Sequence, residues 1–330
     1  MTLGRFVSWG RFVSWGRFVS WRRFVSWGLA LALLTSTSGC GCCRIVRDLD
    51  PPEPVGRHEP PPVSADGVDL GDAAYPPGND AAPIEHAFWV PSLDPERYRI
   101  GYKMPQADAK GLERSYHQWS ASVGHRRISA DRFHWRPPTR CLGGLHCVYE
   151  ELDRQDAITL HPVARRFLDR VRGAALDTGQ AAALVLTFVQ NIRYQIPGDE
   201  PFGVKPPTLV LVDKWGDCDS KSLLAHILLR DLGIESVIIS SDIHKHTMLG
   251  VALPAPGTSF THRGRRYAFA ELTAERAPLG FIDPTLTRPN DWQVVAMRYN
   301  PAAVLPEEGS PPIGGAPAPS KGGPIRLIDR

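Results

Sequence analysis

The sequence has almost no excess of charge of either sign. Its 38 Lys and Arg residues are nearly matched by 35 Asp and Glu residues, which gives a formal net charge of +3. Residues 1–39 hold five arginines and no acidic residue, so the chain without them has 33 basic against 35 acidic residues and a charge of −2. This balance gives no indication of nucleic-acid binding, and we expect no nucleic-acid partner.

The sequence also lacks a hydrophobic run long enough to span a bilayer comfortably. The apolar run at residues 24–34 is only about eleven residues long. It follows Arg22 and Arg23 and precedes the small residues of 35–39, the order typical of a signal peptide. We therefore predict a signal peptide over residues 1–39. Its first part is four near-copies of a hexamer, which place no constant face on a helix.

Small residues stand directly before Cys40 and resemble a bacterial lipoprotein box, except that Thr37 occupies a position where leucine is usual. The resemblance implies that Cys40 is lipidated. It also implies that the protein is anchored to the membrane of the cell envelope, facing the periplasm or the cell exterior. The alternative is an ordinary secretory peptide, with Cys40, Cys42 and Cys43 in disulfides.

Cysteine is scarce in the rest of the chain. Cys141 and Cys147 are six residues apart with two glycines between them, so a local disulfide could close this loop. Cys218 is then left over. An unpaired cysteine in an exported protein indicates a reactive thiol.

Cys218 lies at the predicted start of a helix. Apolar residues recur at helical spacing over 222–232, cap-type residues flank Cys218, and Gly233 follows as a stop signal. The unpaired N–H groups at a helix N-terminus favour an anion, which lowers the pKa of a thiol there. Asp217 and Asp219 oppose thiolate formation, so an imidazolium partner matters more at this position.

The segments after this helix offer a base and a carboxylate. Residues 235–240, 247–253 and 266–272 read as strands, with a Pro and Gly loop at 254–262. His246 opens the second strand and Glu271 lies near the end of the third. A nucleophilic thiol needs such a base and a group that orients it.

Five segments in this order resemble the transglutaminase-like branch of the papain-like cysteine enzymes, over roughly residues 178–290. They are Phe188–Tyr194, Pro206–Leu209, Gly216–Lys221, His246–Val251 and Tyr267–Thr273. The resemblance implies that Cys218 is the nucleophile, His246 the base and Glu271 the orienting group. Asp283 competes with Glu271 for the third role. We prefer Glu271 because its Glu-x-Thr context matches a bacterial subgroup and because Asp283-Pro284 reads as a turn.

The chain divides into segments of different composition. The segment 40–83 is rich in Pro, Asp and Gly and reads as a tether. The segment 84–160 is an aromatic-rich elaboration with a helix at 112–122, and the sequence leaves open whether it is a separate domain. We place the catalytic domain at 161–298 and a disordered tail at 299–330.

Within the catalytic segment, helices at 162–176 and 180–190 precede the strands. This order predicts an α+β fold with a papain-like core, in which the cysteine begins a central helix packed on an antiparallel sheet.

A zinc site is the alternative interpretation of the cysteine and histidines. His244 and His246 lie two residues apart, on one face of a strand, and could join Cys218 as ligands. No second cysteine pairs with Cys218 at zinc-finger spacing, so we expect neither a metal nor a cofactor.

Other side chains near these motifs have two interpretations each. Trp215 either shields the thiol from water or is a plain core aromatic. Gln190 either supplies an oxyanion donor or is the polar end of a helix. His226 lies within the helix and is expected to be structural or on the surface.

We therefore expect an enzyme that attacks amide bonds of a protein or peptide through a thioester. The acyl group then passes to water, as in a peptidase or amidase, or to an amine, as in a transglutaminase, and the sequence does not choose between them. The alternatives are a catalytically silent peptide-binding module and a factor for the assembly or maturation of the cell envelope.

Overall fold

The structure is a computed structural model of the whole chain. It describes residues 7–10, 67–129, 132–141, 145–298, 304–305 and 326–328. Among these, no helix combines the length and apolar character needed to cross a membrane. The predicted lipidation site Cys40, and the predicted signal peptide apart from residues 7–10, lie outside the described residues.

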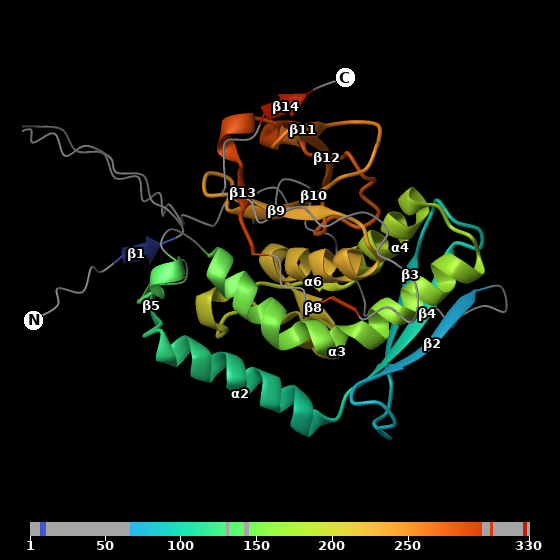
Figure 1. Cartoon of the computed structure of the whole chain (residues 1–330), viewed down its shortest axis with the longest axis horizontal. Helices are drawn as coiled ribbons and strands as arrows, with labels where there is room; N and C mark the ends of the chain where they lie inside the picture. The colour runs from blue at the N-terminus through green and yellow to red at the C-terminus, as the bar shows by residue number, and fades with distance from the viewer. Residues whose placement is uncertain are drawn as a thin grey trace, which may run out of the picture.

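A central helix organises the molecule. The helices are α2 (Gln106–Ser122), α3 (His146–Gly173), α4 (Thr178–Gln190), α5 (Pro207–Asp213) and α6 (Cys218–Asp231). Helix α6 packs against α3, α4 and α5 and, on another side, against strands β9 and β10. Leu224, Ile227 and Leu228 have no exposed surface, as expected for a helix surrounded by protein. Figure 1 shows α6 between the sheet and α3.

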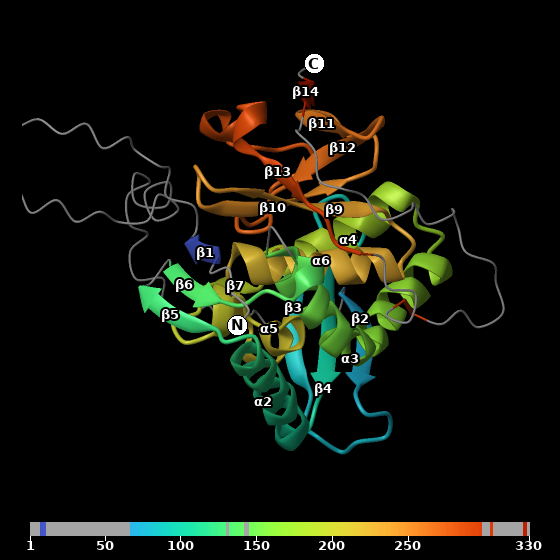
Figure 2. The ribbon, with the colours of Figure 1, turned by 60° about the vertical axis from the view of Figure 1, so that its left-hand side comes forward.

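An antiparallel sheet covers α6. Its strand order is β13-β9-β10-β12-β11-β14, and every neighbouring pair runs antiparallel. The strands are β9 (Ser236–Ser241), β10 (His246–Val251), β11 (Ser259–His262), β12 (Arg265–Ala270), β13 (Gln293–Val295) and β14 (Arg326–Ile328). Figure 2 shows β9 and β10 as the layer next to α6. The predicted α+β fold, with a cysteine beginning a central helix on an antiparallel sheet, is confirmed.

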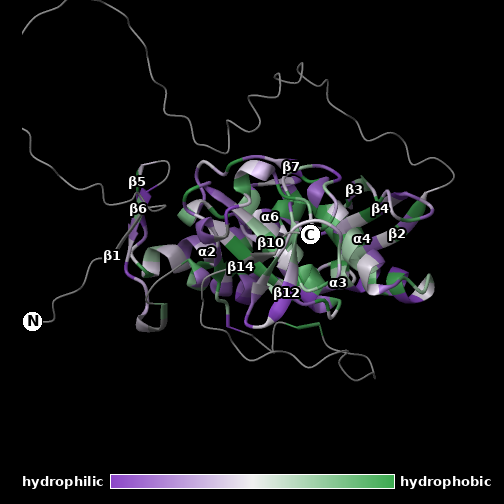
Figure 3. Ribbon diagram, turned by 90° about the horizontal axis from the view of Figure 1, so that it is seen from above, coloured by the Kyte–Doolittle hydropathy of each residue, from purple (hydrophilic) through white to green (hydrophobic). Residues whose placement is uncertain are grey.

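A second sheet lies on the helical side. It consists of β2 (Val68–Ala74), β4 (Arg97–Lys103) and β3 (Ile84–Trp89) in that order, with β2 parallel and β3 antiparallel to β4. Strand β2 packs against α3 and β3 against α4. Seen from above, hydrophobic residues gather where these helices and sheets meet (Figure 3).

Strand β2 lies inside the segment 40–83, which the sequence predicts to be a tether. The strand forms because Leu70 and Ala73 are buried and because Asp69 forms an ion pair with Arg99 of β4. One continuous hydrophobic core also runs from Leu70 through the helices to the sheet over α6. The segment after β2 is therefore packed on the same core as the Cys218 helix.

Helix α3 begins well before Pro162, where the sequence predicts its start. Proline provides no N–H for the carbonyl four residues earlier, so it usually marks a helix start or a kink. Here the helix continues through it because Leu160, Val163 and Phe167 are buried on both sides of the proline. Burial of these side chains outweighs the loss of one backbone hydrogen bond.

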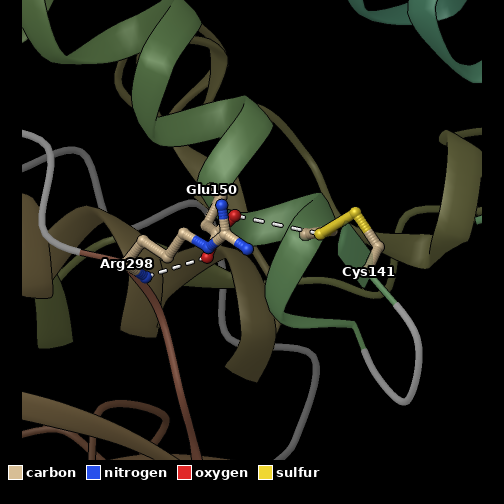
Figure 4. Close-up of a disulfide and its surroundings, with 4 residues drawn as sticks. Cys141, Glu150 and Arg298 are labelled. Atoms are coloured by element: carbon tan, nitrogen blue, oxygen red, sulfur yellow. Dashed lines mark hydrogen bonds between the residues drawn. A yellow bond between two sulfur atoms is a disulfide. The ribbon is translucent and has the colours of Figure 1, made fainter. Parts of the chain in front are cut away.

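A disulfide between Cys141 and Cys147 closes the loop before α3, with Cα atoms 5.7 Å apart. Glu150, one turn into α3, accepts a hydrogen bond from the backbone N–H of Arg298 at 2.8 Å. Figure 4 shows Glu150 between the disulfide and Arg298. The start of α3 thus holds the segment that follows β13.

Two further short sheets complete the described part of the chain. One has the order β1 (Val7–Gly10), β6 (Arg132–Trp135) and β5 (Arg126–Ser129). The other pairs β7 (Arg193–Tyr194) with β8 (Trp215–Gly216) in parallel and leads directly into α6. Strand β1 falls in the predicted signal peptide.

The segment 299–330, predicted to be disordered, contributes two described pieces. Residues 326–328 form β14 beside β11, and Leu305 is buried and donates its N–H to Asp231. The rest of that segment lies outside the described residues.

Candidate active site

Cys218 is the first residue of α6 and is only 3% exposed. The helix begins here because Asp217 is extended and its side chain accepts hydrogen bonds from the N–H of Ser220 at 3.0 Å and its hydroxyl at 2.5 Å. This N-cap leaves the thiol at the positive end of the helix dipole. The helix mouth therefore favours the thiolate form of Cys218.

His246 begins β10, and a side-chain hydrogen bond ties this strand to the first turn of α6. The hydroxyl of Thr247 donates to Asp219 Oδ1 at 2.6 Å, and the hydroxyl of Tyr149 donates to the same oxygen at 2.7 Å. Asp219 follows Cys218, and Thr247 follows His246. The neighbour of the thiol residue, Asp219, is thus hydrogen-bonded directly to the neighbour of the imidazole residue, Thr247.

Glu271 lies immediately after β12, the strand paired with β10. A carboxylate only accepts, so His246 Nε2 donates to Glu271 Oε2, at 2.7 Å. The other carboxylate oxygen accepts from the N–H and the hydroxyl of Thr273, at 2.7 and 2.6 Å. The imidazole is therefore held through Nε2, which leaves Nδ1 as the ring nitrogen that does not face Glu271.

The charge of Glu271 suits this role. Burial raises its pKa, but the hydrogen bonds and charge of His246 and the hydrogen bonds of Thr273 outweigh burial and bring the pKa to about 2. Glu271 therefore stays ionised at neutral pH. An ionised carboxylate at this distance stabilises the imidazolium form of His246.

Asp283 does not take part in this arrangement. It caps the short 3₁₀ helix η3 (Pro284–Leu286), where its side chain accepts from the N–H and the hydroxyl of Thr285 at 2.8 and 2.6 Å. These hydrogen bonds lower the pKa of Asp283. The structure brings Glu271, and not Asp283, to His246.

The structure adds Trp292, just before β13, which the sequence did not single out. Its ring lies edge-to-face with His246, with centroids 6.2 Å apart, and its indole N–H donates to the carbonyl of Leu286 at 2.7 Å. The neighbouring Asp291 pairs with His244 at 2.9 Å. No local pattern connects residues 291–292 with His246, because the contact arises from the pairing of β13 with β9.

Within the described residues, Cys218 does not form a group of neighbouring ligand atoms with His244 and His246. His244 is bonded to Asp291 and His246 to Glu271. The ligand atoms of Asp217, Cys218 and Asp219 lie within 4.8 Å of one another. Both carboxylates already accept hydrogen bonds from neighbouring side chains.

Gln190 is not placed as an oxyanion donor. Its side-chain amide donates to the carbonyls of Glu271 at 2.8 Å and Ala277 at 2.9 Å, so it links the end of α4 to the loop after β12. His226 is structural, since its Nδ1 is bonded to the Ser236 hydroxyl at 2.8 Å and burial lowers its pKa to about 3.

Trp215 is half-buried, and the ammonium of Lys205 lies 3.3 Å from its ring centroid. A cation–π contact at this distance fixes the indole against Lys205.

Thiol, imidazole and carboxylate in this order can perform nucleophilic catalysis on a carbonyl. Comparison with known proteins agrees with this chemistry: residues 165–278 match the family model of the transglutaminase-like superfamily. No curated protein and no solved structure gives a significant match. The matched segment runs from within α3 to beyond β12, and it contains Cys218, His246 and Glu271.

Proposed function

We propose that the protein is a cysteine enzyme that acts on amide bonds through a thioester, because residues 165–278 match the family model of the transglutaminase-like superfamily. The hydrogen bond of 2.7 Å between His246 and Glu271 carries the proposal. It orients an imidazole on a strand that Thr247 and Asp219 tie to the helix of Cys218. A purely structural histidine does not require an ionised carboxylate behind it.

The reaction begins with proton transfer from the Cys218 thiol to His246 Nδ1. The sulfur attacks the amide carbonyl carbon, and the N–H groups at the mouth of α6 favour the resulting oxyanion. The C–N bond breaks as His246 returns the proton to the leaving amine, which leaves a thioester. Water or a second amine then attacks the thioester, its proton passes to His246 and then to the sulfur, and the C–S bond breaks.

The substrate class is a protein or peptide, and the acceptor is water or an amine. Incubation with a peptide library and a labelled amine, followed by mass spectrometry, tests both. Incorporated amine indicates acyl transfer, and cleaved or deamidated peptides indicate hydrolysis. The control is Cys218→Ala; a wild-type protein that gives the same products as this variant overturns the proposal.

We propose further that the enzyme is exported and anchored to the membrane of the cell envelope through a lipid on Cys40. The basic, apolar and small residues before Cys40 support this. The disulfide between Cys141 and Cys147 supports it independently, because such bonds form and persist in oxidising compartments.

A second candidate is a catalytically silent module that binds peptide or assists envelope assembly through the same site. The burial of Cys218, at 3% exposure, favours this reading, because a substrate carbonyl must reach the sulfur. The two functions differ in one outcome of the library experiment. A silent module enriches certain peptides without changing their mass.

A further inference from the structure

Lys221 lies one turn after Cys218 on α6 and has no exposed surface. Its ammonium donates to the carbonyls of Gln190 at 3.2 Å and Ile192 at 2.7 Å. These carbonyls lie at the C-terminus of α4 and in the turn that follows, where helix carbonyls lack intrahelical partners and carry partial negative charge. A buried lysine therefore joins the helix of the nucleophile to the end of α4.

The same turn also holds Glu271. The Gln190 side chain donates to the backbone carbonyl of Glu271 at 2.8 Å, while its own backbone carbonyl accepts from Lys221. The path from Lys221 through Gln190 reaches the residue that orients His246. Lys221 thus fixes α6, α4 and the end of β12 relative to one another.

The two residues that flank Cys218 in the chain are acidic, so a positive charge nearby would stabilise a thiolate at this position. Asp217 and Asp219 flank the thiol and are 1% and 6% exposed. The hydroxyl groups of Ser220, Tyr149 and Thr247 that hydrogen-bond to them are neutral. Two buried carboxylates disfavour a third negative charge on the neighbouring sulfur.

Lys221 can supply a positive charge near the sulfur because it stays protonated at neutral pH. Burial lowers its pKa to about 8, and the negative charges of Glu271, Glu275 and Cys218 oppose any further fall. The ammonium therefore interacts with both the sulfur and the orienting carboxylate. Charge interactions in a buried site are screened much less than at the surface.

We propose that Lys221 is a positioning residue for the thiol site: its buried ammonium fixes the end of α4 against α6 and offsets the negative charge of a Cys218 thiolate and of Glu271. This inference rests on the proposed role of Cys218 as nucleophile. It assigns the positive charge that stabilises the thiolate to Lys221, a residue outside the triad of Cys218, His246 and Glu271.

The test is the rate of Cys218 alkylation by iodoacetamide against pH in the full chain, with peptide mapping to locate the label. Lys221→Gln keeps a hydrogen-bond donor but removes the charge, and Lys221→Met removes both. Both variants should raise the pH midpoint of the alkylation rate by about one unit. The control is Lys103→Met, which removes another lysine with a carboxylate partner, Asp72 on the second sheet, and should leave the midpoint unchanged.

A wild-type midpoint in either folded Lys221 variant overturns the proposal. If neither variant folds by circular dichroism, Asp219→Asn replaces them, because it keeps an acceptor oxygen for Tyr149 and Thr247 and removes one negative charge. Its alkylation midpoint should then fall to a lower pH. An unchanged midpoint overturns the proposal that nearby charges control the ionisation of Cys218. If Cys218 of the wild type alkylates like an ordinary thiol, the proposed function fails and not only the role of Lys221.

Discussion

Glu271 shows how two neighbours set the chemistry of one buried side chain. Each of its carboxylate oxygens has a different partner, His246 on one side and Thr273 on the other. Burial alone would favour the neutral acid, and the hydrogen bonds reverse that preference. Asp283 has a similar Thr partner but no imidazole, so its hydrogen bonds do no more than cap a turn.

Replacing Glu271 with Gln should lower turnover in the amine-incorporation assay by about a hundredfold or more, on the scale of positioned acid–base groups. The amide presents one acceptor and one donor. It therefore cannot accept from His246 and from Thr273 at once, and the imidazole loses its orientation.

The matched control for this experiment is Asp283→Asn, which removes the competing carboxylate and should cost much less activity. The roles are reversed if the Asp283 variant is inactive while the Glu271 variant remains active. If both remain active while Cys218→Ala is inactive, the site works as a dyad.

Local patterns predicted the helices and strands that carry the site. Helix α6 follows from its apolar spacing and the Asp217 cap, and β9, β10 and β12 from β-branched or alternating runs between turn residues. Strands β2, β11 and β13 were not predicted, because short segments become strands only when a distant partner pairs with them. Trp292 was missed for the same reason. The order of Cys218, His246 and Glu271 in the chain could be predicted from the sequence. The hydrogen bonds made by the side chains of Lys221, Gln190 and Thr247 could not, because they join residues far apart in the chain.

A buried carboxylate joins α3 to α5 and gives this contact a pH dependence. Asp156 is fully buried, and one of its oxygens accepts from the N–H of Thr208 at 2.9 Å. Its other oxygen, Oδ1, has no hydrogen-bond partner within the described residues. Burial raises the pKa of Asp156 to about 7, so the folded state holds a proton that the unfolded state releases. This stabilising contribution is complete below about pH 4 and is lost as the pH rises through about 7.

Asp156→Asn should therefore be more stable than the wild type at pH 8, by about 1 kcal/mol or more, and should show no such advantage at pH 4. The amide keeps an acceptor for Thr208 and carries no charge. Urea unfolding of both proteins across this range measures the difference. A stability difference that does not change with pH would mean that Asp156 is not protonated in the folded state.

For the molecule as a whole, the proposed lipid anchor and the disulfide of the described domain indicate the same cellular compartment. The disulfide lies at the start of α3, far along the chain from Cys40, and both features point to an oxidising compartment. Strand β2 belongs to the described domain, so fewer residues separate the proposed anchor from the domain than the predicted tether has.

Cys40→Ser should release the protein from the membrane fraction, because a serine hydroxyl cannot form the thioether that joins the lipid to Cys40. Fractionation and intact mass measure the change, and the mass should fall by that of the lipid. Cys42→Ser is the control and should stay with the membrane. A Cys40 variant that remains in the membrane fraction, with no lipid mass on the wild type, rejects the anchor and leaves the secretory alternative.

The central claim is that His246 activates Cys218, and the alkylation rate of that thiol tests it without a known substrate. At pH 7 an ordinary thiol is only a few per cent ionised, so activation can raise the rate by about tenfold or more. We predict that iodoacetamide labels Cys218 faster in the folded protein than in the denatured chain and that His246→Gln removes this advantage. Equal or slower labelling in the folded wild type, unaffected by His246→Gln, would contradict the account.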